Sequence, residues 1–177
     1  MVVLFLINWK WVSINVAGRY TGNYSNAGFR IILVLKKFRM SYLFVQWEKP
    51  FQRIEDLMDL YVDPWWTRSR QVDQVETMLA HSTYLFGLID YADDRMVGFA
   101  RVLSDGVFRG ILFDVIIHPD YQGQGLGRQL MDGILQAPCI QALETFELYC
   151  KPEHVELYGK FNFYPIAPGL HYLRLMK

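Results

Sequence analysis

The feature that most constrains the fold is a glycine-rich turn between an apolar, strand-like run and an amphipathic helix. The apolar run ends at Ile117, and the turn after it contains glycines at alternate positions, Gly123, Gly125 and Gly127. The residues that follow show the apolar spacing of a helix, which Pro138 ends. A strand that leads through such a turn into a helix is typical of an α/β fold.

The same turn predicts a site for a phosphorylated ligand. Glycines let the backbone approach a ligand closely, and the free N–H groups at a helix N-terminus bind pyrophosphate. The turn is not a P-loop, because the G-K-[ST] sequence is absent. A dinucleotide fingerprint fits poorly, since the strands before the turn indicate an antiparallel meander and not a βαβ unit. A glycine-rich helix entry with no ligand is the alternative.

Hydrophobic periodicity from residue 41 onward predicts an α/β (α+β) fold with a mixed, mostly antiparallel central sheet and helices on both faces. Of the expected helices, the second along the chain is expected to have Thr67 or Ser69 as its N-cap. The expected helices span residues 51–61, about 69–79, 126–135 and 152–161, and the expected strands span residues 42–47, 83–91, 96–103, 107–117 and 144–150, with a terminal pair at 163–165 and 170–176.

Charge divides the chain into two parts. Residues 1–40 contain six basic and no acidic residues, so the remainder carries twelve basic against eighteen acidic residues. We interpret residues 1–39 as a basic, acid-free N-terminal extension, either disordered or a mis-assigned start with Met40 as the alternative initiator. Residues 40–177 form the predicted domain. A transit peptide is also basic and acid-poor, but this stretch has few serines and is too apolar for that class.

Composition argues against several classes of protein. A formal net charge of zero argues against a nucleic-acid partner. The apolar run at the N-terminus is too short to span a membrane, so no membrane partner is expected. Two cysteines and four histidines lack ligand spacing, which argues against a metal site. A cytoplasmic monomer or homodimer is expected.

Two segments resemble the GNAT superfamily of acyl-CoA-dependent N-acetyltransferases. The turn matches the Q/R-x-x-G-x-G/A signature of that family, and residues 155–163 are similar to its helix with a tyrosine, here Tyr158. Asn162 stands where the family has glycine, and asparagine tolerates the left-handed backbone next best. The signature residues are Gln122, Gly123, Gln124, Gly125, Leu126 and Gly127.

The resemblance implies acetyl-CoA as the co-substrate, and the spacing of cysteines and histidines predicts no metal. The resemblance also implies that pantetheine lies along Val115, Ile116 and Ile117, and that the turn through to Arg128 wraps the pyrophosphate. It further implies that Tyr158 is the general acid that protonates the departing thiolate.

The general base is less clear from the residues. Asp114 is a candidate base or substrate-positioning group, but on a regular strand it points opposite to Phe113, and only a bulge would change that. Glu147 and a water chain are competitors, and His118 and His154 are weaker candidates.

Trp65 and Trp66 lie where the family covers the acceptor groove, so they are the expected substrate contacts, and a lid over the core is the alternative. The acidic balance of the domain favours a cationic acceptor such as a polyamine, a lysine side chain or a protein N-terminus. The expected function is acetyl transfer from acetyl-CoA to a primary amine of a small molecule or a protein. A non-catalytic acetyl-CoA-binding module is the alternative, and the presence of Tyr158 favours the enzyme.

Overall fold

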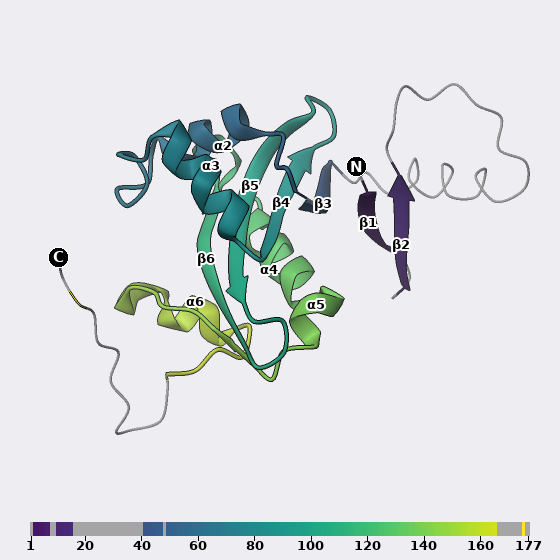
Figure 1. Ribbon diagram of the computed structural model, residues 1–177, viewed down its shortest axis with the longest axis vertical. Helices are drawn as coiled ribbons and strands as arrows, with labels where there is room; N and C mark the ends of the chain where they lie inside the picture. The colour runs from purple at the N-terminus through teal and green to yellow at the C-terminus, as the bar shows by residue number, and fades with distance from the viewer. Residues whose placement is uncertain (1, 8–9, 16–40, 48, 166–174, 176–177) are drawn as a thin grey trace, which may run out of the picture.

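The centre of the molecule is a five-stranded sheet, with the strands in the spatial order β3-β4-β5-β6-β7 (Figure 1). The computed structural model describes residues 2–7, 10–15, 41–47, 49–165 and 175. Each pair of adjacent strands from β3 to β6 is antiparallel, and β7 is parallel to β6. The predicted mixed, mostly antiparallel sheet is therefore confirmed. The strands are β3 (Tyr42–Trp47), β4 (Tyr84–Asp90), β5 (Arg95–Ser104), β6 (Arg109–Ile117) and β7 (Thr145–Glu147).

Helices cover both faces of this sheet, as predicted (Figure 1). Helices α2 (Ile54–Tyr61) and α3 (Val72–His81) lie on one face, and α4 (Leu126–Gln136) lies on the other. Two apolar clusters result, because alternate side chains of a strand point to opposite faces. On β5, Phe99 packs into the α2–α3 cluster and its neighbour Ala100 into the α4 cluster. The sheet is thus buried from both sides around β5.

Several predicted boundaries differ from the structure. The N-cap of α3 is Gln71, which forms a reciprocal capping box with Gln74, so neither Thr67 nor Ser69 caps this helix. Strand β7 is shorter than the predicted strand, because it pairs with β6 over three residues only. The predicted helix at 152–161 is a short 3₁₀ turn followed by α6 (Val155–Gly159).

Two further segments bear on the predicted boundaries. Pro138 does end α4, but it also begins α5 (Pro138–Gln141), a helical turn that was not predicted. Residues 163–165 are irregular and not a strand. Their predicted partner, residues 170–176, lies outside the described residues except for Leu175.

Near the N-terminus, β1 (Val2–Ile7) and β2 (Lys10–Asn15) pair antiparallel in a two-stranded sheet of their own. Residues 16–40 lie outside the described residues. The division into an extension and a domain therefore stays a prediction. Among the helices that the structure describes, none is long and apolar enough to cross a membrane.

Candidate active site

The site begins where β6 and β7 part. The two strands pair only between Arg109 and Ile111 on β6 and the facing residues of β7, whereas β6 continues to Ile117. Within the described part of the chain, no strand pairs with residues 112–117 on that side. Half of the backbone groups of this segment therefore face an open edge, which suits a ligand that binds as an added strand would.

Beyond β6 the chain passes through a 3₁₀ turn, Pro119–Tyr121, and then through the glycine turn into α4. Gly123 and Gly125 have φ values of 73° and 80°, which only glycine adopts without strain. A Cβ atom added at either glycine would meet nothing within 4 Å. The turn is therefore an open backbone cradle at the N-terminus of an eleven-residue helix.

The side chains of the turn hold the turn itself. Gln122 donates from Nε2 to the carbonyl of Ile117 at 3.0 Å, and Gln124 accepts from the Tyr42 hydroxyl at 3.0 Å. Leu126 is buried in the α4 cluster. Any contact of these residues with a ligand would therefore come mainly from their backbone N–H groups.

The remaining predicted cofactor contacts are Val115, Ile116 and Ile117 on β6 and Gly127 and Arg128 on α4. Ile116 is buried, and Val115 and Ile117 are half-buried against the apolar clusters, so what this segment offers to the open edge is its backbone, at alternate residues. Gly127 lies in the first turn of α4. Arg128 is largely exposed, with Nε 3.6 Å from the Asp132 carboxylate.

Tyr158 lies on α6 and is half-buried, edge-to-face with Phe163 at 6.2 Å between ring centroids. Burial raises the pKa of its hydroxyl, and the nearby Cys150 thiol raises it further. Among the described residues, none forms a hydrogen bond with this hydroxyl. Asn162, at φ 65°, closes the turn after α6, and the Phe163 N–H donates to the Tyr158 carbonyl at 3.2 Å. Asparagine thus adopts the left-handed backbone expected of it.

A β-bulge in β6 turns Asp114 toward the α2–α3 face. Between its pairings with Arg101 and Phe99, β6 advances three residues while β5 advances two, and Asp114 has φ 53°. Arg101 Cζ lies 4.6 Å from the Phe113 ring centroid, while Arg101 Nε donates to Asp114 Oδ2 at 2.7 Å. Phe113 and Asp114 therefore both face Arg101, which a regular strand would not allow.

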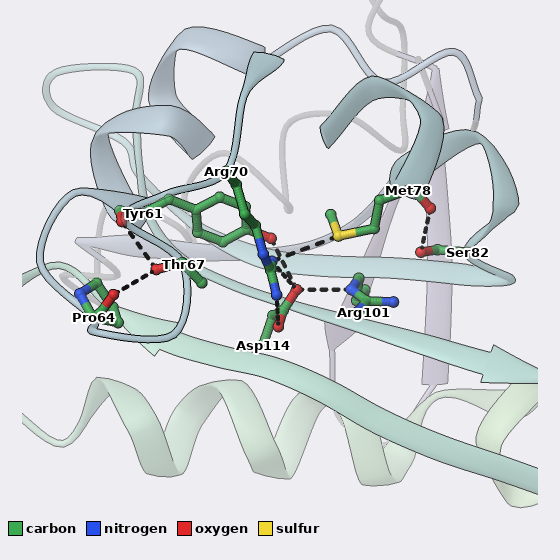
Figure 2. A network of polar contacts seen from close by, with 8 residues as sticks. All are labelled: Tyr61, Pro64, Thr67, Arg70, Met78, Ser82, Arg101 and Asp114. Carbon is green, nitrogen blue, oxygen red and sulfur yellow. Dashed lines mark hydrogen bonds and ion pairs between the residues drawn. The ribbon is translucent and has the colours of Figure 1, made fainter. Parts of the chain in front are cut away.

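The Asp114 carboxylate is the centre of a polar network (Figure 2). It accepts from Arg70 Nη1 at 2.7 Å and Nη2 at 3.1 Å, from Arg101, and from the Tyr61 hydroxyl at 3.0 Å. Burial alone would raise the pKa of Asp114, but the bonds and charges of Arg70 and Arg101 outweigh burial and lower it. A carboxylate held in this way is a weak proton acceptor, so its contacts favour a positioning role over a basic one.

The other candidate bases, Glu147, His118 and His154, lie in other surroundings than Asp114. Glu147 lies on the paired part of β7, 3.5 Å from Arg109. His118 is buried, with Nδ1 accepting from the Asp120 N–H at 3.2 Å and Nε2 lying 3.0 Å from Arg95 Nη2. His154 is exposed at the start of α6.

Trp65 and Trp66 lie in the connection between α2 and α3, and they are 60% and 45% exposed. The Thr67 hydroxyl holds this connection by donating toward the carbonyls of Tyr61 at 2.9 Å and Pro64 at 3.0 Å (Figure 2). Lys151 Nζ lies 5.6 Å from the Trp65 ring centroid. The α2–α3 connection therefore meets the segment that follows β7, from which Tyr149 contacts Phe113 at 5.5 Å between ring centroids.

Sequence reasoning missed the basic and aromatic partners of Asp114, Phe113 and Trp65. One signal for Arg101 was available: it is a lone charge between Ala100 and Val102 in a strand that is otherwise apolar. The missed residues are Tyr61, Arg70, Arg101, Tyr149 and Lys151. Among the described residues, no three His, Cys, Asp or Glu side chains gather as metal ligands.

Comparison with known proteins adds sequence and structural relatives. A family model described as an acetyltransferase (GNAT) domain matches residues 55–170. The uncharacterised N-acetyltransferase ycf52 of Pyropia yezoensis is 31% identical over 154 residues, which cover 82% of this chain and 86% of that protein. The protein of the same name from Porphyra purpurea is 35% identical over 103 residues, covering 57% of this chain and 59% of that protein. The match to the latter thus spans less than two thirds of its length.

Among solved structures, a Xanthomonas campestris pv. campestris protein described as belonging to the GNAT family aligns with a TM-score of 0.63 and 29% identity. The alignment covers 75% of this chain and 93% of that protein.

Proposed function

The chain belongs to the GNAT acetyltransferase family, and from that premise we propose that it transfers the acetyl group of acetyl-CoA to a primary amine. The acceptor is the amine of a small molecule or of a protein. One observation carries the proposal: the unpaired edge of β6 at residues 112–117 leads into an open glycine cradle at the N-terminus of α4.

The residues fit acetyl-CoA at both ends of this path. The cradle around Gly123 and Gly125 leaves room for a ligand against its backbone, and the N–H groups of the first turn of α4 suit a pyrophosphate. Val115, Ile116 and Ile117 offer backbone groups in strand geometry, which suit the amides of pantetheine.

When bound, acetyl-CoA supplies an activated acyl group whose thiolate can leave. The amine nitrogen attacks the thioester carbonyl carbon while a backbone N–H of β6 stabilises the oxyanion. The C–S bond then breaks, the thiolate takes the proton of the Tyr158 hydroxyl, and the amine loses its extra proton to water, from which Tyr158 is reprotonated. The raised pKa of Tyr158 supports this role, because the hydroxyl keeps its proton until a thiolate forms.

In this proposal Asp114 is a positioning residue that holds the bulge of β6. Trp65 and Trp66 contact the acceptor. Asp114 fixes the bulge of β6 through Tyr61 and two arginines. Trp65 borders the segment after β7 through Lys151, and Trp66 lies edge-to-face with Trp65 at 5.8 Å between ring centroids. The monomeric or dimeric state and the cytoplasmic location stay predictions.

The test is to mix the full chain with acetyl-CoA and a panel of amines and lysine-containing peptides, and to measure release of free thiol together with equilibrium binding of acetyl-CoA. We expect binding, and amine-dependent thiol release with at least one acceptor. Binding of acetyl-CoA without turnover on any acceptor would instead support the non-catalytic module. Absence of binding would contradict both.

A further inference from the structure

The network around Asp114 contains more positive than negative charge. Arg70 and Arg101 both form ion pairs with the single carboxylate of Asp114, at 2.7 Å each. Among the described residues, no other acidic side chain forms an ion pair with either arginine. The Asp114 side chain is only 5% exposed, and the Arg101 side chain is 11% exposed. A partly buried cation in excess is costly unless an anion approaches it.

Arg101 keeps donors free for such an anion. Its Nε donates to Asp114, whereas its two terminal nitrogens have no hydrogen-bond partner among the described residues. No fully buried side-chain nitrogen or oxygen in the described part of the chain lacks a partner, so these terminal nitrogens keep some contact with solvent although Arg101 as a whole is buried. In Figure 2, Arg70 reaches Asp114 from the α2–α3 connection, while Arg101 lies alongside it on the sheet.

The free donors lie beside the proposed acceptor site. The guanidinium of Arg101 stacks over Phe113, which contacts Tyr149 in the segment that leads to Cys150 and α6. Lys151, two residues further along from Tyr149, contacts the Trp65 ring at this edge and is paired with Glu153 at 3.5 Å. Because two arginines surround one carboxylate, the charge near the β6 bulge is positive, although residues 41–177 as a whole are acidic.

We propose that Arg101, together with Arg70, binds an anionic group of the acceptor, so that the acceptor is an amine that also carries a carboxylate or a phosphate. This inference rests on the proposed acetyl transfer and names its substrate class. The planar guanidinium of Arg101 presents two parallel N–H donors, which match either anion. Holding the anion at the bulge keeps the acceptor in place while its amine reaches the open edge of β6.

A binding experiment tests the anion site without any acetyl transfer. The probes are 3-phenylpropionate and 3-phenylpropionamide, which differ in charge but hardly in shape, titrated into the full chain by calorimetry with acetyl-CoA absent and present. We expect the acid to bind roughly tenfold or more tightly than the amide, because bonds to a charged partner are the stronger ones. Phenyl phosphate in the same titration distinguishes a site that prefers phosphate from one that prefers carboxylate.

Substitutions test whether Arg101 causes the tighter binding of the acid over the amide. Arg101→Gln should reduce it to within about twofold, while Arg101→Lys should keep part of it because the charge remains but the fork is lost. Arg109→Gln is the matched control, because Arg109 is an exposed arginine on the neighbouring strand and should leave the preference unchanged. If Arg101→Gln does not fold, the comparison of acid with amide on the unchanged chain still decides, since equal binding of the two probes overturns the proposal.

A second arm separates this proposal from the proposed function. The acceptors 4-(2-aminoethyl)benzoate and 4-(2-aminoethyl)benzamide share one amine and differ in the anionic group. We expect a kcat/KM roughly tenfold higher for the benzoate, mostly through KM. Preferential binding of acids with no acetylation of any amine would retain the anion site and reject the acetyltransferase. Equal kcat/KM for the two acceptors would retain the enzyme and reject the anion site.

Discussion

At Asp114 the backbone adopts a left-handed conformation that residues with a side chain rarely adopt. The cost is of the order of 1–2 kcal/mol, and the donors from Tyr61, Arg70 and Arg101 compensate for it only while the carboxylate is charged. The side chain therefore holds the bulge, and the bulge turns Asp114 and Phe113 to the same face of the sheet. The direction of the groups beside the open edge depends on this one residue.

Asp114→Asn should lower the free energy of unfolding at pH 7 by about 3 kcal/mol, because it leaves two partly buried guanidinium groups without their counter-charge. Chemical denaturation of both proteins measures this difference. Asp132→Asn is the control, since the pair of Asp132 with Arg128 is exposed and its loss should cost about 1 kcal/mol or less. A cost at Asp114 no larger than that of the control would mean that the network does not hold the bulge.

The loss of unfolding free energy caused by Asp114→Asn should become smaller as the pH falls. The pKa of Asp114 is lower in the folded chain than its unfolded value of about 3.9. Its stabilising contribution is therefore fully present above about pH 5, and it is lost as pH falls through the lower folded pKa. We expect the stability curves of the parent and of Asp114→Asn to converge below about pH 4. A gap that stays constant down to pH 3 would contradict the charged network.

Tyr158→Phe should separate binding from chemistry. Because the hydroxyl has no partner among the described residues, its loss should leave folding and the affinity for acetyl-CoA nearly unchanged. The kcat should fall by roughly 10² to 10⁴, the range typical of a positioned general acid. Calorimetry and steady-state kinetics measure the two effects, and a kcat within about threefold of the parent would remove Tyr158 from the proposed reaction.

For single residues, the sequence predicted backbone conformation better than side-chain contacts. The left-handed turn at Asn162 and the open glycines could be inferred, because both follow from the conformational tolerance of single residues. The partners of Asp114 could not, since Arg70 and Arg101 are 44 and 13 residues away from it along the chain and meet it only through the tertiary fold.

Among the elements, the glycine turn and α4 carry the prediction that is easiest to isolate. Gly125→Ala adds a Cβ to the open cradle and should weaken acetyl-CoA binding at least tenfold, because that atom occupies space against the backbone where the ligand is proposed to lie. The left-handed backbone should also cost about 1–2 kcal/mol of stability.

Gly106→Ala separates the two effects. Gly106 has φ 81°, close to that of Gly125, and a Cβ there would meet only the Tyr84 hydroxyl at 3.9 Å. The two variants should lose similar stability, measured by thermal unfolding, while only Gly125→Ala loses affinity for acetyl-CoA. Equal affinity in both variants would place the ligand elsewhere.

Elements with a long, regular pattern matched their predictions, as did the short strand β3, whereas the short elements after α4 did not. Helix α4 agrees closely because its apolar spacing covers three turns. The predicted strand at 144–150 was too long, because periodicity does not report where two strands part. The chain departs from β6 after Glu147, and this departure creates the open edge of the candidate site.

For the whole molecule, we expect a chain that begins at Met40 to fold like the full chain. Although β1 contacts the central sheet at its edge strand β3, the strands β1 and β2 pair with each other in a sheet separate from the central one. Its melting temperature should therefore lie within about 4 °C of the parent, measured by calorimetry. A fall of more than about 10 °C would show that residues 1–39 stabilise the domain.

The divergence of β6 from β7 also gives the molecule an internal reporter of occupancy. Alternate amide protons of β6 point toward β5 and are protected by the sheet, whereas those between them in residues 112–117 point toward the open edge. The second set should exchange with deuterated water quickly in the free chain and slowly once a ligand accepts their hydrogen bonds. One strand thus holds both the signal and its reference, and the ratio of their exchange rates measures how fully the edge is occupied.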